Sequence, residues 1–181
     1  MTGPAATTET RGAVDAPDRF GRWSLAAMRI TLGVLWMTNA GWKRPPDFGE
    51  DGGTGLFRFT SLAVEHPVFP PYTWFVETVV LPNFRIFGWV VLITEALLGA
   101  FLVIGLLTRF WAVVGVGMSL TIALSVVLAP GEWPWAYYLM AVGHLGLAGT
   151  AAGRFAGLDG ILRSVWGRRA GRGNRLAEAL S

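Results

Sequence analysis

The stretch that decides the fold is FRIFGWVVLITEALLGAFLVIGLL, residues 84–107. A helix rises about 1.5 Å per residue, so this segment is long enough to cross a hydrocarbon core of roughly 30 Å with some tilt. One carboxylate, Glu95, lies near its middle with apolar residues on both sides. Because an acidic side chain costs about 2.5–3.5 kcal/mol at the centre of a membrane helix, we expect Glu95 to face a protein interior or a wet cavity.

Composition places the whole chain in the same class. The 181 residues are 52% hydrophobic and only 15% charged, whereas soluble domains carry about 25% charged residues. The chain has no cysteine, which excludes disulfides, thiolate chemistry and cysteine-held Fe–S clusters within it. The net charge is +3, but the basic residues flank apolar segments. This pattern is typical of membrane orientation, and we expect no nucleic-acid binding.

Three further apolar segments of comparable length accompany the first, at residues 23–42, 111–129 and 135–153. The sequence therefore predicts an all-α integral membrane protein, a four-transmembrane-helix up-and-down bundle in contact with the lipid bilayer. The membrane domain would occupy residues 23–162. A flexible cytoplasmic tail, residues 1–22, would precede it, and a basic cytoplasmic tail, residues 163–181, would follow it.

The outer loop, residues 43–82, opens with Pro and Gly residues that stop a helix. Two short stretches follow with apolar residues at helical spacing, LFRFTSLAV and YTWFVETVVLP. They predict short amphipathic helices that lie on the membrane face or form a lid over the mouth of the bundle.

Charge asymmetry orients the predicted bundle. Most arginines fall in the two terminal segments and at Arg109, whereas the outer loop is rich in Asp and Glu. Lys and Arg concentrate on the cytoplasmic side of membrane proteins. Together with the even number of spans, this predicts a multi-pass protein of the bacterial cytoplasmic (inner) membrane with both termini in the cytoplasm.

Three ionisable residues lie within the predicted spans: Arg29, Glu95 and His144. Counting from the inner ends of their spans places them roughly 9, 18 and 14 Å deep, respectively. A Glu95–His144 pair steadied by Arg29 would form a proton-handling catalytic site for a quinone, since His can bond a carbonyl and Glu can exchange a proton. The alternatives are that the three satisfy one another structurally, that His144 bonds a neighbouring helix, and that Arg29 reaches the headgroups.

The nine tryptophans give a second set of candidates. Most of them lie where spans meet the membrane interface, as an aromatic belt does. Trp36 and Trp89 lie deeper and, with Asn39, are candidates for lining a pocket for a flat-ring cofactor, although core packing also explains the two rings. Haem is not expected, because one of the two histidines, His66, is in the outer loop. We also expect no metal.

Several longer motifs resemble the DoxX/DoxD family of small four-span membrane proteins. They are AGWKR at residues 40–44, TEALLGAFLVIGLLTR at 94–109 and AGRFAGLDGIL at 152–162. HPVFPPYTWFVETVVLPN, at residues 66–83, is similar to the DoxD branch in particular. That resemblance implies the small membrane subunit of a thiosulfate:quinone oxidoreductase. That enzyme needs a second, water-exposed subunit or domain, which this sequence does not contain. DoxX relatives are implicated instead in membrane-associated redox-stress complexes.

Two functions follow as hypotheses. The first is a quinone-interacting membrane subunit of an oxidoreductase complex, in which a protein partner supplies the electrons. The alternative is a non-catalytic membrane scaffold or accessory subunit that recruits a redox-stress or cell-envelope partner. The first predicts a cavity between the second and fourth spans that is open laterally to lipid. The second predicts a well-filled bundle and an apolar patch on a face outside the membrane. The oligomeric state is left open by the sequence.

Overall fold

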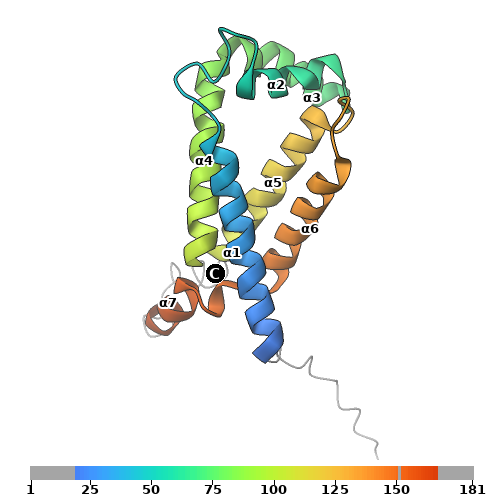
Figure 1. The fold of residues 1–181 in the computed structure, drawn as a ribbon. Coiled ribbons are helices and arrows are strands. Elements are labelled where there is room, and N and C mark those ends of the chain that lie inside the picture. Colours follow the sequence, from blue (N-terminus) through green and yellow to red (C-terminus); the bar gives the residue numbers. More distant parts are fainter. Residues whose placement is uncertain (1–18, 151, 167–181) are drawn as a thin grey trace, which may run out of the picture.

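The computed structural model describes residues 19–150 and 152–166, and this part of the chain is helical without strands (Figure 1). Four long helices run along the molecule: α1 (Arg19–Gly41), α4 (Phe84–Ile104), α5 (Thr108–Val126) and α6 (Pro134–Thr150). The short helices α2 (Gly55–Glu65) and α3 (Pro70–Phe75) cross one end of the molecule, and α7 (Leu158–Trp166) lies at the other end. Most of the two expected tails, residues 1–22 and 163–181, lies outside the described residues. Their described parts are helical, since residues 19–22 belong to α1 and residues 163–166 to α7.

A π-helical turn, η1 (Val76–Val80), and a 3-10 turn, η2 (Leu81–Asn83), join α3 to α4. A second 3-10 turn, η3 (Ala152–Arg154), precedes α7. The segment Pro70–Ile104 is therefore helical throughout. The second amphipathic stretch of the outer loop is thus not a separate surface helix, but the start of the helical segment that contains α4.

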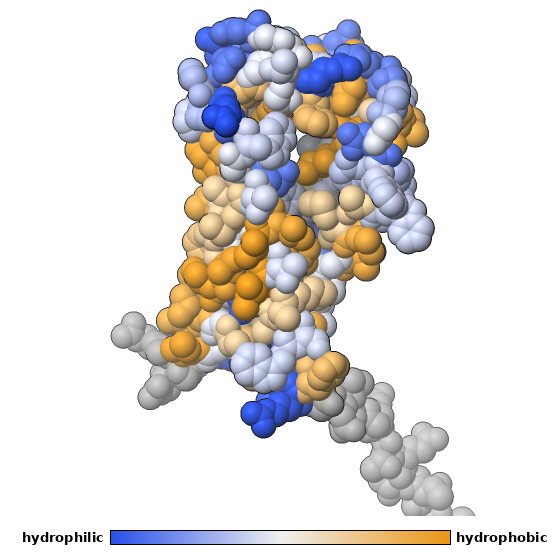
Figure 2. Space-filling model, viewed as in Figure 1, coloured by the Kyte–Doolittle hydropathy of each residue, from blue (hydrophilic) through white to orange (hydrophobic). Residues whose placement is uncertain are grey.

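Two helical segments are long and apolar enough to cross a membrane, namely Pro70–Ile104 and Thr108–Val126, with mean hydropathies of 2.2 and 1.6. Helix α1 is less apolar because it carries Arg19, Arg22 and Arg29, and α6 has only 17 residues. Large apolar side chains are nevertheless exposed on all four long helices: Ile30, Val34, Ile86, Val90, Val113, Leu120, Val142 and Leu145. Apolar residues cover much of the middle of the face shown in Figure 2. These exposed surfaces indicate a membrane protein.

The long helices pack mainly as two pairs, α1 with α4 and α5 with α6. Glycines bring the first pair close together, because a Cβ added at Gly33 would lie 2.8 Å from the carbonyl oxygen of Gly99. Small residues allow this kind of close approach in membrane helices. The two pairs diverge toward the end that carries α2 and α3 (Figure 1).

At the opposite end, one carboxylate holds the turn between α4 and α5. Helix α4 ends at Ile104 and is followed by Gly105, whose φ of 68° is left-handed, and the backbone reverses before Thr108. The buried Asp159 of α7 accepts hydrogen bonds from the backbone N–H groups of Leu107 (2.7 Å) and Thr108 (2.9 Å). These N–H groups at the start of α5 have no partner within the helix. The GLDG part of the closing motif therefore caps α5 and fixes α7 against the bundle.

Candidate functional site

The divergence of the two helix pairs leaves a cavity of about 1080 Å³ between them. Its walls come from α1, α4, α5 and α6, and α2, α3 and η1 cover it. Most of the lining is apolar, including Leu32, Val76, Phe84, Val91 and Ile122. Figure 2 shows a hollow on this face below the end that carries α2 and α3. Pockets for small ligands usually measure about 300–1,000 Å³ and have apolar walls with a few polar groups.

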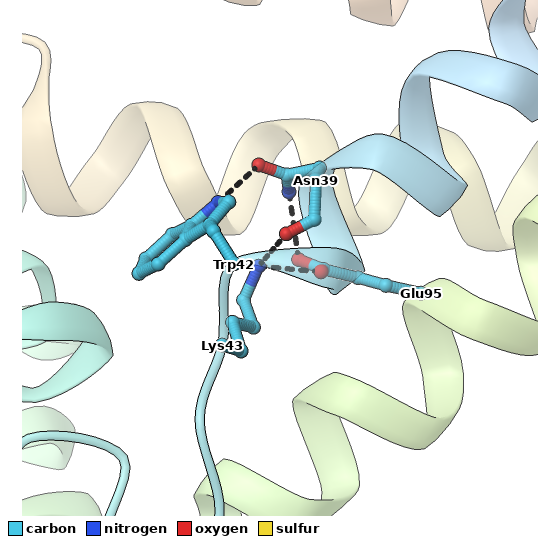
Figure 3. A network of polar contacts seen from close by, with 4 residues as sticks. All are labelled: Asn39, Trp42, Lys43 and Glu95. Atoms are coloured by element: carbon cyan, nitrogen blue, oxygen red, sulfur yellow. Dashed lines mark hydrogen bonds and ion pairs between the residues drawn. The ribbon is translucent and has the colours of Figure 1, made fainter.

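The main polar group on the wall is built around Glu95 (Figure 3). Its Oε2 accepts a hydrogen bond from the Lys43 ammonium at 2.5 Å, and its Oε1 accepts one from the Asn39 amide at 3.0 Å. Asn39 Oδ1 in turn accepts a bond from the Trp42 indole at 3.1 Å. The predicted interior position of Glu95 agrees with an exposed fraction of 1%. Its charged partner is Lys43, which sequence reasoning had assigned to the outer loop.

The end of α1 explains how Lys43 reaches that position. The helix stops at Gly41, and the Lys43 N–H closes a turn onto the carbonyl of Ala40. The side chain then folds back so that its ammonium also donates to the carbonyl of Asn39 at 3.0 Å. Lys43 is 5% exposed, and burial lowers the pKa of its amine while the Glu95 carboxylate opposes that shift. A buried ion pair persists only where hydrogen bonds satisfy both charges. The hydrogen bonds among Lys43, Glu95 and Asn39 meet this condition.

The structure does not place His144 beside Glu95. Its Nε2 accepts a hydrogen bond from the Trp36 indole at 2.9 Å, and its Nδ1 lies 2.6 Å from the carbonyl of Met140. Nδ1 therefore carries the proton in a neutral ring that bridges α1 and α6. His144 is fully buried, and neither it nor Trp36 lines the cavity. The predicted Glu95–His144 pair is not formed, because the ring is already satisfied by its own contacts.

Arg29 is also directed elsewhere. Its guanidinium donates to the carbonyls of Leu102 and Val103 at the end of α4, and to Ala156 beside α7, at 2.5, 3.0 and 2.7 Å. The last carbonyls of a helix have no partner within it, and the helix dipole favours a cation there. Arg29 thus joins α1 to the end of α4 and does not reach Glu95. The predicted three-residue cluster is not brought together.

Of the three candidates for a flat-ring cofactor pocket, only Asn39 lines the cavity. Its amide donates a hydrogen bond to Glu95. Trp36 is 1% exposed and belongs to the packed core with Leu98, Leu102 and Leu147. Trp89 is 44% exposed and packs edge-on against Phe48, away from the cavity. Within residues 19–150 and 152–166, no group of three or more His, Cys, Asp and Glu side chains is arranged to hold a metal ion.

Sequence reasoning missed a second polar group in the cavity. The Tyr72 hydroxyl of α3 lies 2.8 Å from the Ser125 hydroxyl and 3.2 Å from the carbonyl of Thr121, both on α5. All three residues line the cavity. The sequence carries only a weak signal for this contact, since Tyr72 follows two prolines and its partner lies 53 residues away.

These features define a helical membrane protein with a ligand-sized apolar cavity and a buried ion pair on its wall. A family model described as "TQO small subunit DoxD" matches residues 57–170, which is more than half of the chain. The chain belongs to the DoxD family. Membership, which confirms the resemblance seen in the sequence, indicates a membrane subunit of a quinone oxidoreductase. Comparison with curated proteins gave no match, and comparison with solved structures gave none either.

Proposed function

We propose that this chain is the quinone-binding membrane subunit of an oxidoreductase complex, and that the cavity beside Glu95 and Lys43 is its quinone site. One observation carries the proposal: an apolar cavity of about 1080 Å³ has a buried, hydrogen-bonded ion pair on its wall. An apolar core alone would be filled by side chains, because protein interiors are close-packed. An unfilled space next to buried charge is instead the usual arrangement of a ligand site.

The residues present suit a quinone. Phe84, Phe87 and Val91 offer an apolar wall for a flat ring. A lysine ammonium has three N–H donors, and the contacts to Glu95 and Asn39 use two of them. No hydrogen bond among the described residues uses the third, although the ammonium also lies 4.5 Å from the centroid of the Trp42 ring, and we assign this donor to a ring carbonyl. The volume also exceeds that of most small-ligand pockets, which leaves room for part of an isoprenoid chain.

An opening between α1 and α6 suits a ligand that enters from the bilayer. Leu35 of α1 and Leu139 of α6 both line the cavity and are 53% and 65% exposed. We infer that the passage to the outside lies between these two side chains. An isoprenoid chain would leave the cavity there, between two apolar residues, and continue into lipid.

Glu95 is the residue that we assign to proton handling. Its carboxylate is held between Asn39 and Lys43, and it lies on the cavity wall where a ring oxygen would be placed. A bound quinone supplies the two-electron acceptor chemistry. Since the chain contains no cysteine, we assign the electron donor to a partner protein. Arg29 and His144 hold the helices in place in this proposal and take no part in proton transfer.

The membrane arrangement belongs to the same proposal. All four long helices would span the bilayer, since each exposes large apolar side chains along its outer face. The acidic α2–α3 end would lie outside the bacterial cytoplasmic membrane. Both termini would lie inside, in accord with the position of Arg19 and Arg22 at the other end.

The test is quinone binding to the purified protein in lipid nanodiscs. We expect saturable binding by the wild type and at least about tenfold weaker binding by Glu95→Gln, equivalent to 1.4 kcal/mol. Glu77→Gln is the matched control, because it makes the same change at an exposed position that does not line the cavity. Absence of binding by a well-folded wild type would favour the scaffold hypothesis. The unfilled cavity argues against that hypothesis, which predicts a well-filled bundle.

A further inference from the structure

The cavity has hydrogen-bonding groups on two sides. The first group, Asn39, Lys43 and Glu95, comes from α4 and the end of α1. The second, Tyr72 and Ser125, comes from α3 and α5, which belong to the cover and to the other helix pair. The described lining between them is predominantly apolar. Thr60 and Tyr137 also line the cavity, but their hydroxyls donate to Leu56 and Glu132. The two separated polar groups therefore indicate a ligand that is polar at two places.

The Tyr72 hydroxyl donates to the Thr121 carbonyl, and a ligand would have to replace that acceptor. Ser125 can donate to the Tyr72 oxygen at 2.8 Å, and the two residues also share the Thr121 carbonyl as an alternative acceptor. When Ser125 donates to the tyrosine oxygen, the Tyr72 O–H keeps only its bond to the Thr121 carbonyl, which at 3.2 Å is long for an O–H donor, and the hydroxyl can exchange it for a ligand oxygen. Tyr72 lines the cavity and is half-buried, so a ligand oxygen there can accept this proton in a hydrogen bond.

We propose that Tyr72 is the second hydrogen-bond donor of the site, and that it binds the ring carbonyl opposite the one held by Lys43. This inference rests on the proposed quinone function and deepens it. A 1,4-quinone has acceptor oxygens on opposite edges of a flat ring, so it needs donors from two sides. A phospholipid or a fatty acid has one polar end and would leave one of the two groups without a partner. Tyr72 would therefore select a dicarbonyl ring over other apolar molecules.

The experiment compares two ligands and two tyrosine variants in nanodiscs. The ligands are a 1,4-benzoquinone and a ring with one carbonyl, each carrying the same isoprenoid chain. Tyr72→Phe removes only the hydroxyl. Tyr138→Phe is the matched control, because Tyr138 is 61% exposed on α6 and does not line the cavity. We expect Tyr72→Phe to weaken binding of the quinone about tenfold and to leave binding of the one-carbonyl ring within about twofold of the wild type.

Equal weakening of both ligands would overturn the inference, because it would show that Tyr72 acts by holding α3 against α5. An unchanged quinone affinity in Tyr72→Phe would overturn it as well. If Glu95→Gln still weakened quinone binding in that case, the proposed function would stand without a role for Tyr72. If the folded wild type bound no quinone, the proposed function itself would fail.

Discussion

Replacing Lys43 by methionine should strongly destabilise the protein, and replacing Glu95 as well should restore much of the loss. The Nζ–Oε2 distance is 2.5 Å, and the two side chains are 2% and 1% exposed. A surface pair contributes at most about 1 kcal/mol. Removing one member of a buried pair costs about 3–5 kcal/mol, because the remaining charge loses its partner. Methionine preserves the aliphatic stem, so lost packing adds little.

The assay is a double-mutant cycle on the free energy of unfolding, measured in one detergent or nanodisc system. The variants are Lys43→Met, Glu95→Gln and the pair together. We expect a coupling energy of about 2 kcal/mol or more, since the double variant buries no charge at this place. Additivity within about 0.5 kcal/mol would show that Lys43 and Glu95 are not coupled. It would mean that the two charges are solvated independently, and that the ion pair does not form the cavity wall.

Three further substitutions test the packing that positions the site. Gly115→Ala should cost about 1–3 kcal/mol, since the new Cβ would lie 2.1 Å from the ring of His144. The control is Gly117→Ala, whose new Cβ meets nothing within 4 Å and which should be neutral or stabilising when both variants are compared by thermal unfolding. Equal losses of stability in the two variants would contradict the contact between residue 115 and His144. Asp159→Ala should cost about 1–3 kcal/mol by leaving the buried Thr108 N–H and the partly buried Leu107 N–H unpaired, and a neutral effect on unfolding would show that the cap is dispensable. Arg29→Lys should lower the unfolding temperature but leave quinone affinity unchanged, because one ammonium nitrogen cannot replace the two guanidinium nitrogens that bond α4 and Ala156; a parallel loss of affinity in a folded variant would return Arg29 to the site.

Hydropathy predicted the long helices well and their ends less well. The start of α4 at Phe84 agrees with the predicted segment 84–107, but the helix ends at Ile104. Gly105 and Leu107 both adopt positive φ, which allows α5 to begin at Thr108 rather than at residue 111. An apolar turn of this kind leaves no mark on hydropathy. It depends on Asp159, a contact more than 50 residues away in the sequence.

The interior position of Glu95 could be predicted because a carboxylate in lipid is costly. Its partner was predicted wrongly, because depth estimates compare positions along a span but not directions around a helix. Lys43 reaches Glu95 from beyond the end of α1 by folding back over Asn39. One signal pointed to it: Lys43 is the only lysine of the chain. Tyr72 could not be identified, because its position depends on how α3 covers the two helix pairs.

The most direct test of the quinone site is photoaffinity labelling with an azido-quinone in nanodiscs, followed by peptide mass spectrometry. We expect labelling of cavity residues, above all Asn39, Lys43 and Tyr72. Excess unlabelled quinone should abolish this labelling. Labelling confined to outward-facing residues such as Trp89, or labelling that excess quinone does not reduce, would contradict the proposed quinone site.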